Sequence, residues 1–231
     1  MIEPWVVQAS TYAADIDGII LLVGVLVGFW FLVAEGVLLW LIVRYRAKPG
    51  VRSDYITGEE AKQKRWVAWP HYLVLVCDVF ILVGAIRVWV EVKQQLPPEP
   101  EAQRVRVISQ QWAWSFVHPG PDGKLDSADD IRTVDDLHVQ VDQKYIYELE
   151  SRDVLHSFSV PVFRLKQDAV PGRVISGWFE ATRTGTHDIQ CVEICGIGHG
   201  VMGARIVIES PEQHAAWMAQ HASTQLAAHA R

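Results

Sequence analysis

Residues 18–43, GIILLVGVLVGFWFLVAEGVLLWLIV, carry a single charge, Glu35. An apolar run of this length, wound as a helix, crosses the hydrocarbon core of a bilayer, which is roughly 30 Å thick. A second run, residues 66–86, WVAWPHYLVLVCDVFILVGAI, also carries a single charge, Asp78. The alternative, two buried helices of a soluble protein, is disfavoured because apolar runs this long are rare in soluble folds. We therefore predict membrane-spanning helices over 18–44 and 66–92.

The segments that flank these runs predict their orientation. Residues 44–65 contain seven basic and three acidic residues, so the positive-inside rule places the 45–65 loop in the cytoplasm. Residues 1–17 contain acids but no basic residue, and the first run is far longer than the core of a signal peptide, so we expect a retained anchor. Both termini are then expected on the extracytoplasmic side of a bacterial inner membrane.

After the second run the pattern changes to a period of two. A Pro- and Glu-rich linker over 93–103 leads into residues 104–210, where short alternating segments rich in Val, Tyr and Trp are separated by turn residues. We expect about six to eight strands forming a β-sandwich or small barrel. Residues 211–231 are expected to form a helix after Pro211, followed by a frayed end.

Charge limits the partners of this domain. The chain has a formal net charge of -6, which disfavours a nucleic-acid partner. Residues 122–142 contain seven aspartates against two basic residues. We interpret this stretch as a hairpin excursion, either a solvated loop, an acidic docking patch for a basic partner, or a cation site. Docking through the patch would make the rate fall as salt rises.

The run QCVEICGIGHGVMG, residues 190–203, concentrates sulfur and imidazole. Outside the cytoplasm two cysteines are by default a disulfide, but a loop this short would gain little from one. Two thiolates, an imidazole and a thioether form a soft donor set, which selects copper. A mononuclear blue-copper site uses one cysteine, whereas two thiolates on one loop can bridge two metal ions. Each ion then needs one imidazole.

His199 supplies one imidazole, and the best candidate for the second is His156, within the β-rich sequence SRDVLHSFSVP. The remaining histidines are weaker candidates for the second imidazole ligand. One lies in the predicted membrane helix, two flank the acidic stretch, one is expected to face solvent just before Cys191, and three lie in the tail helix. In chain order they are His71, His118, His138, His187, His214, His221 and His229.

Three stretches together resemble a known family. DVLHSFSVPVFRLKQDAVPGR (153–173) and CVEICGIGHGVM (191–202) are similar to the binuclear copper (CuA) domain of cytochrome c oxidase subunit II, and the second fits the family pattern C-x-E-x-C-x3-H-x2-M. QQWAWSF (110–116) resembles the aromatic strand of that family. The resemblance covers nearly the whole chain. It implies a two-span helical hairpin followed by an all-β cupredoxin-type Greek-key barrel or sandwich.

The resemblance also implies roles for single residues. Cys191 and Cys195 would bridge both coppers. His156 and Met202 would complete one copper, and His199 with the backbone carbonyl of Glu193 would complete the other. The Glu193 side chain would face a magnesium ion shared with subunit I. Trp112 would receive the electron from cytochrome c, with a packed strand aromatic as the alternative, and Lys166 and Asp168 would lie at the interface with subunit I.

The expected function is therefore that of subunit II of a respiratory cytochrome c oxidase. It accepts electrons from cytochrome c for subunit I, which reduces oxygen to water with proton translocation. Two alternatives remain: the electron-accepting subunit of another haem–copper enzyme, such as a CuA-type nitric oxide reductase, and a non-redox membrane-anchored sandwich with a disulfide.

The chain departs from the family at the start of the second span. Many members carry a glutamate three residues before the first tryptophan, at the mouth of a proton path, and here that position is Gln63. Glu59 and Glu60 lie one turn earlier, and Glu35 and Asp78 are ionisable groups within the spans. We assign no proton-path role to any of these residues.

Overall fold

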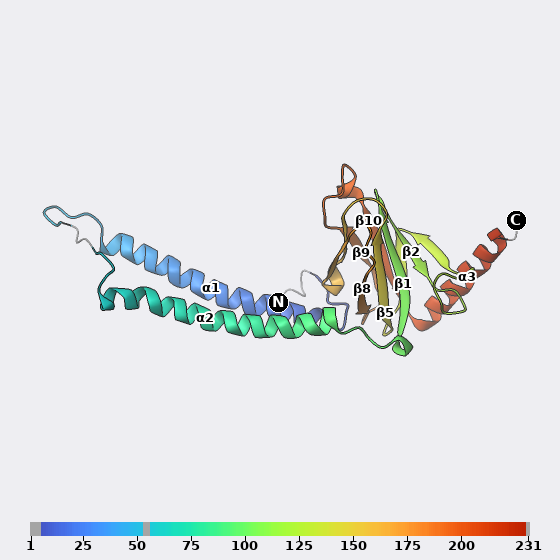
Figure 1. Ribbon diagram of the computed structural model, residues 1–231, viewed down its shortest axis with the longest axis horizontal. Helices are drawn as coiled ribbons and strands as arrows, with labels where there is room; N and C mark the ends of the chain where they lie inside the picture. The colour runs from blue at the N-terminus through green and yellow to red at the C-terminus, as the bar shows by residue number, and fades with distance from the viewer. Residues whose placement is uncertain (1–5, 53–55, 230–231) are drawn as a thin grey trace. The chain divides into compact units, whose positions relative to one another are not determined.

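The computed structural model describes residues 6–52 and 56–229, with side chains to residue 222. The chain forms two compact units (Figure 1), the helical stretch Asp17–Trp89 and a unit made from the described parts of Met1–Ile16 and Val90–Arg231. Both predicted classes of structure are present, namely two long apolar helices followed by a β-sandwich.

The helical unit consists of α1 (Ala13–Arg44) and α2 (Ala61–Trp89), and α2 continues into a short π-helical turn, Val90–Gln94. Each helix is long and apolar enough to cross a bilayer. Each begins five residues before its apolar run does. For α2 the reason is that the Ala, Lys, Gln and Arg residues at 61–65 are themselves good helix formers. Trp30 donates a hydrogen bond from Nε1 to Sγ of Cys77, at 3.4 Å, which joins the two helices near mid-length.

The β domain has ten strands in two five-stranded sheets, counted over the described residues. The first sheet has the order β3-β2-β1-β5-β8 and the second β4-β10-β9-β6-β7. The first sheet comprises β1 (Ala102–Gln110), β2 (Ala113–His118), β3 (Ile131–Val134), β5 (Lys144–Ser151) and β8 (Ile175–Glu180). The second comprises β4 (Asp136–Gln140), β6 (His156–Val160), β7 (Leu165–Ala169), β9 (Gly185–Cys191) and β10 (Gly203–Glu209).

Aromatic side chains hold the two sheets together. Phe158 of the second sheet meets Trp114, Phe116 and Tyr147 of the first at ring-centroid distances of 5.4, 6.5 and 6.1 Å. All four rings are buried, and burial of such large apolar surfaces is the main stabilisation available to a sandwich of this size.

More strands form than the expected six to eight, because two alternating runs each divide at a turn: residues 104–116 form the β1–β2 hairpin, and residues 137–151 form β4 and β5, which lie in different sheets. Between β1 and β2 the chain reverses at Gln111 and Trp112 without a glycine or proline. Hydrogen bonds from distant residues hold this turn: the Gln111 backbone N–H donates to Asp153, and the Trp112 indole donates to the carbonyl of Cys195. Such contacts leave no local signal in the sequence.

The N-terminal segment before α1 joins the β domain. The backbone N–H of Ala9 donates to Val162, and the Ala9 carbonyl accepts from Thr182, both at 2.9 Å. The Tyr12 hydroxyl donates to the carbonyl of Trp178 at 3.2 Å. The extracytoplasmic segment predicted over 1–17 is therefore, in its described part, tied to the edge of the sandwich beside β8.

The acidic stretch contains the expected hairpin excursion, between the antiparallel strands β2 and β3, and then continues into the other sheet. Its loop at 119–130 leads into β3, which pairs with β2, and β4 then pairs with β10 in the other sheet. Several aspartates have structural partners: Asp126 pairs with Arg106, Asp136 pairs with Arg205, and Asp135 accepts the backbone N–H of Trp114. These contacts favour the interpretation of a structured surface loop over a cation site.

The C-terminal helix α3 (Pro211–His229) begins with a capping box. The Ser210 hydroxyl accepts the N–H of Gln213, and the Gln213 side chain accepts the N–H of Ser210. Trp217 of α3 packs against the sandwich and is only 9% exposed.

Candidate metal centre

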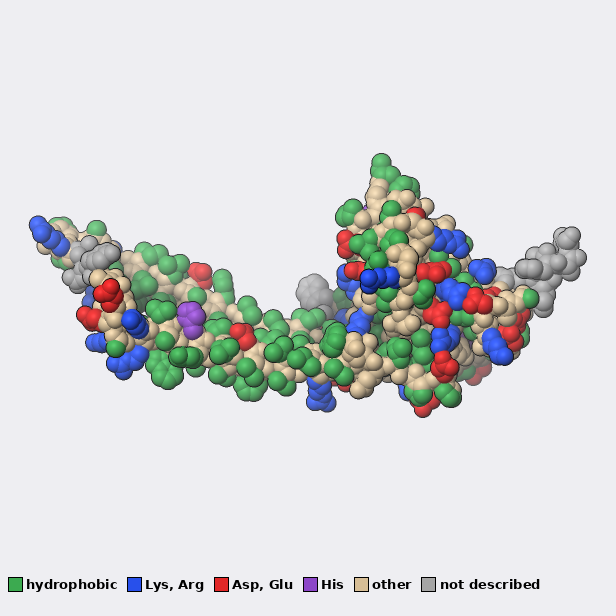
Figure 2. Space-filling model, in the orientation of Figure 1, with side chains coloured by type: hydrophobic (Ala, Val, Ile, Leu, Met, Phe, Trp, Pro, Cys, Tyr) green, Lys and Arg blue, Asp and Glu red, His purple; other side chains and the backbone are tan. Residues whose placement is uncertain are grey.

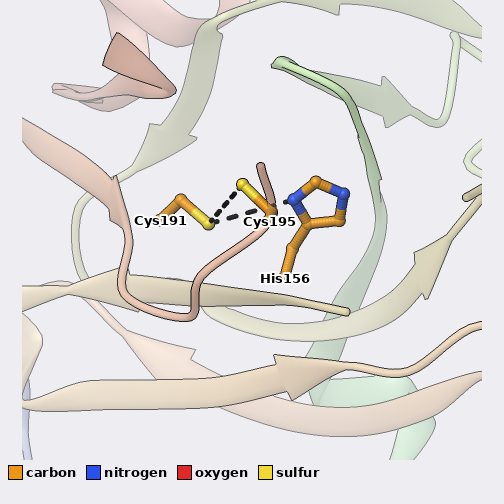
Figure 3. A group of neighbouring side chains, drawn as sticks. All are labelled: His156, Cys191 and Cys195. Carbon is orange, nitrogen blue, oxygen red and sulfur yellow. Dashed lines mark hydrogen bonds between the residues drawn. The ribbon is translucent and has the colours of Figure 1, made fainter. Parts of the chain in front are cut away.

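Strand pairing brings the predicted ligands from distant parts of the chain together. His156 is the first residue of β6 and Cys191 the last of β9, and these neighbouring antiparallel strands pair Phe158 with Cys191. The Nδ1 atom of His156 lies 3.9 Å from Sγ of Cys191, which lies 3.8 Å from Sγ of Cys195. Figure 3 shows the two thiols and the imidazole facing one another, and their ligand atoms all lie within 4.8 Å.

The remaining predicted donors surround the same thiols. Sγ of Cys195 lies 3.6 Å from Nδ1 of His199 and 3.8 Å from Sδ of Met202. The carbonyl oxygen of Glu193 lies 3.4 Å from Sγ of Cys191. A backbone hydrogen bond from Cys191 to Met202 closes the base of the loop, at 3.2 Å. All six groups named from the sequence therefore converge on one volume.

The two thiols do not form a disulfide, because a sulfur separation of 3.8 Å far exceeds the 2.05 Å of an S–S bond. Both thiols are buried. Burial is the larger cause, and the hydrogen bond with Cys191 the smaller, that raises the pKa of the Cys195 thiol to about 11. A thiolate here thus needs a nearby cation. The donors of this pocket, namely two sulfurs from thiols, one thioether and two imidazoles, fit copper in the soft-ligand series.

Asp153 fixes the orientation of His156. Its Oδ1 lies 2.8 Å from Nε2 of His156, while its Oδ2 accepts the backbone N–H of Gln111 at 2.6 Å. With a carboxylate on Nε2, that nitrogen carries the ring proton and Nδ1 keeps its lone pair directed at Cys191. This carboxylate–histidine arrangement is characteristic of metal ligands. Asp153 was not predicted from the sequence, although an acid three residues before a candidate ligand could have indicated it.

Trp112 lies directly against the ligand loop. Its indole N–H donates to the carbonyl of Cys195 at 3.2 Å, and the Gln111 side chain donates to the same oxygen at 2.8 Å. A side chain at Gly198 would meet the indole ring at 2.4 Å, so this close approach requires glycine. Trp112 remains 39% exposed, whereas Trp114 is fully buried in the core. The indole thus joins solvent to a cysteine of the cluster through one hydrogen bond.

Two further residues considered from the sequence, Asp168 and His187, lie on the same sheet as His156 and Cys191. Asp168 on β7 accepts hydrogen bonds from Ser157, the residue after His156, and from Lys166. Of the rejected histidines, His187 is only partly exposed, and its Nε2 is buried without a hydrogen-bond partner in the described part of the chain. The expectation that His187 faces solvent is therefore wrong, because His187 lies on the same face of β9 as the buried Ile189 and Cys191.

Comparison with known proteins bears on this site. The family described as cytochrome c oxidase subunit II, periplasmic domain, matches residues 103–211. The alternative cytochrome c oxidase subunit 2 of Bradyrhizobium diazoefficiens is 30% identical over 239 residues, which span 94% of this chain and 83% of that protein. The chain belongs to the cytochrome c oxidase subunit 2 family.

Further similarities agree with this membership. The cytochrome c oxidase subunit 2 of Thermostichus vulcanus is 29% identical over 265 residues, covering 93% of this chain and 77% of that protein. The crystal structure of the periplasmic domain of subunit II (CoxB) of Bradyrhizobium japonicum matches with a TM-score of 0.50 and 24% identity, over 56% of this chain and 99% of that chain, which supports the fold. The protein is thus a membrane-anchored, copper-binding subunit of an oxidoreductase complex that contains further oxidase subunits.

Proposed function

We propose that the six converging donors hold a binuclear copper (CuA) centre, with which this subunit accepts single electrons from cytochrome c for subunit I. Subunit I then reduces oxygen to water, coupled to proton translocation. The single observation that carries the proposal is the convergence of two unpaired thiols, two imidazoles and a thioether on one buried volume. When bound, the copper pair supplies a one-electron carrier whose unpaired electron is shared by both ions.

The ligand roles follow from the donors. Cys191 and Cys195 would bridge the ions. His156 and Met202 would complete one ion, and His199 with the Glu193 carbonyl would complete the other. Asp153 holds the His156 ring in place, so that the ligand is preorganised before metal arrives. The Glu193 side chain would reach a magnesium ion shared with subunit I, and Lys166 and Asp168 would contact that subunit.

Trp112 is the group at which electrons would arrive. Around it the ligand loop exposes apolar side chains: Ile194, Ile197 and Val201 are 76%, 96% and 84% exposed. The acidic loop leaves β2 at His118, six residues after Trp112, so about 20 Å of strand separates the two. An apolar surface beside the indole supports a donor that docks mainly by apolar contact, and it argues against docking through the acidic loop.

The topology completes the proposal. The basic loop between α1 and α2 would lie in the cytoplasm of a bacterial cell, and the metal domain and both termini on the outer face of the inner membrane. The donor, an exported cytochrome c, then meets Trp112 directly.

Stopped-flow mixing tests this function. The copper-loaded full-length chain, mixed with reduced cytochrome c, is expected to oxidise the cytochrome by one electron per chain. Trp112→Leu is expected to slow this step about tenfold or more, with copper content unchanged, because the indole that joins solvent to Cys195 is lost. Trp178→Leu, a half-buried tryptophan of β8, serves as the matched control. Equal rates in Trp112→Leu and the parent would contradict the assigned role, and no electron uptake at all would reject the function.

A further inference from the structure

A groove on the helical unit has no role in electron transfer. It has a volume of about 480 Å³ and is lined by Trp30 of α1 and by a single face of α2. The α2 residues lie at positions i, i+3, i+4, i+7, i+8 and i+11, which share one side of a helix. They are Lys62, Arg65, Trp66, Trp69, Pro70 and Leu73.

The groove is cationic at one end and apolar along the rest. Lys62 and Arg65 lie in the first turns of α2 and have no ion pair among the described residues. Figure 2 shows Lys and Arg side chains gathered at this end of the helices. Trp66 and Trp69 follow, 80% and 62% exposed. Tryptophan prefers the level of the lipid headgroups, and a basic pair at that level attracts a phosphate.

The length of the groove matches a lipid chain. From Lys62 to Leu73 the helix rises about 16 Å, close to half of the roughly 30 Å hydrocarbon core. Trp30, which is bonded to Cys77 near the middle of the helices, closes the deep end. A ligand here would thus place a charged group beside Lys62 and Arg65 and an acyl chain between Trp30 and Leu73.

We propose that this groove binds one anionic glycerophospholipid, with its phosphate held by Lys62 and Arg65. Guanidinium and ammonium groups donate charge-assisted hydrogen bonds to phosphate oxygens. Bare tryptophans would also suit the choline of a zwitterionic lipid, but the two adjacent cations repel a quaternary ammonium. The charge of the groove therefore selects phosphatidylglycerol over phosphatidylcholine.

Native mass spectrometry of the full-length chain in a mild detergent tests the proposal. With an equimolar mixture of phosphatidylglycerol and phosphatidylcholine, we expect about tenfold more bound phosphatidylglycerol, since two basic side chains favour the anionic headgroup. Lys62→Gln/Arg65→Gln is expected to reduce the ratio to about one. The matched control, Lys48→Gln/Arg52→Gln, removes the same charge from the segment between α1 and α2, outside the groove, and should keep the preference. Equal loss in both variants would overturn the site and leave only general surface charge.

A second measurement locates the acyl chain and tests the assembled oxidase. In nanodiscs, phosphatidylglycerol with brominated chains should quench tryptophan fluorescence more than brominated phosphatidylcholine, and Trp66→Phe/Trp69→Phe should remove the excess. The purified oxidase should retain phosphatidylglycerol that Lys62→Gln/Arg65→Gln releases. Identical retention in both complexes would show that the phosphatidylglycerol is bound elsewhere than at Lys62 and Arg65, and would overturn the proposal.

Discussion

Two ends of the β domain each gather histidines, but at only one end do their ring nitrogens face sulfur. At the end formed by the β9–β10 loop, two imidazoles meet two thiols and a thioether. At the other end, four imidazoles surround Trp217 of α3: His138 stacks on it at 4.3 Å, His221 lies at 4.7 Å, His118 at 5.0 Å and His214 at 5.7 Å. The second cluster has more histidines than the first.

The difference lies in where the ring nitrogens point. At the Trp217 end, Nδ1 of His138 and Nδ1 of His214 lie 2.8 and 2.9 Å from the two oxygens of Glu209, and Nδ1 of His221 bonds the Trp217 carbonyl. At the ligand end Nδ1 of His156 and of His199 face sulfur. Among the described residues, only the group of His156, Cys191 and Cys195 brings such ligand atoms within 4.8 Å. Convergence of soft donors, and not the number of histidines, distinguishes a metal centre from the packing of a helix.

Substitutions at the two ends should differ most in how much copper the chain binds. Cys195→Ser should reduce copper from two ions per chain to one or none, because no other thiolate can bridge. His214→Gln, at the Trp217 end, should leave copper unchanged. Elemental analysis after loading and desalting measures both. Full copper in Cys195→Ser, with a delocalised mixed-valence spectrum, would show that Cys195 is not a bridge.

A substitution at the Trp217 end should instead change stability and leave copper binding unchanged. Trp217→Ala should lower the free energy of unfolding by about 3 kcal/mol, because a nearly buried tryptophan leaves a cavity under α3. Chemical denaturation of the full-length chain measures this change, and copper binding should persist. Trp112→Ala, on the exposed side of the ligand loop, should cost far less. Loss of copper in Trp217→Ala would mean that the two ends are coupled.

A smaller change in copper affinity is expected when the carboxylate that orients His156 is removed. Asp153→Ala should weaken copper affinity by about 10- to 100-fold, because the carboxylate that orients His156 is lost. Competition with a chelator measures the affinity. Asp136→Ala, which removes a carboxylate paired with the exposed Arg205, is the control. Equal affinity in the parent and Asp153→Ala would leave Asp153 as a support for the Gln111 turn only.

Stability should also depend on pH through the Trp217 end. Burial, followed by the nearby His214, His138 and His221, lowers the pKa of His118 to about 3. Below about pH 6.5 His118 binds a proton in the unfolded chain but stays neutral in the folded chain. The free energy of unfolding should therefore fall by about 1.4 kcal/mol per pH unit down to about pH 3. Above pH 6.5 His118 contributes no slope. Denaturation of His118→Gln across this range should show a flatter profile, with His187→Gln as the control. Parallel profiles for the parent and His118→Gln would refute the assignment.

Features that depend on neighbouring residues could be predicted from the sequence, whereas contacts between distant strands could not. The two spans and the β-sandwich were predicted correctly, because apolar length and period-two alternation are local properties. The groups that converge could be named because donor type and spacing in residues 191–202 are also local, and His156 followed from the need for a second imidazole; their role as copper ligands stays a prediction. Glu209, by contrast, becomes the partner of His138 and His214 only after β4, β10 and α3 pack together.

Long-range contacts explain two other misses. The turn at Gln111 and Trp112 depends on Asp153 and Cys195, and the N-terminal segment depends on the edge of β8. No periodicity or turn residue marks either feature. The wrong expectation for His187 has a different origin, because strand alternation places His187 on the same face of β9 as the buried Ile189 and Cys191, and that local pattern was overlooked.

One measurement tests the central claim most directly, namely copper content together with the electron paramagnetic resonance spectrum of the loaded full-length chain. We expect two coppers per chain and one unpaired electron shared by both ions, with the signal unchanged in His214→Gln. A single copper per chain, no copper, or an electron localised on one ion would contradict it.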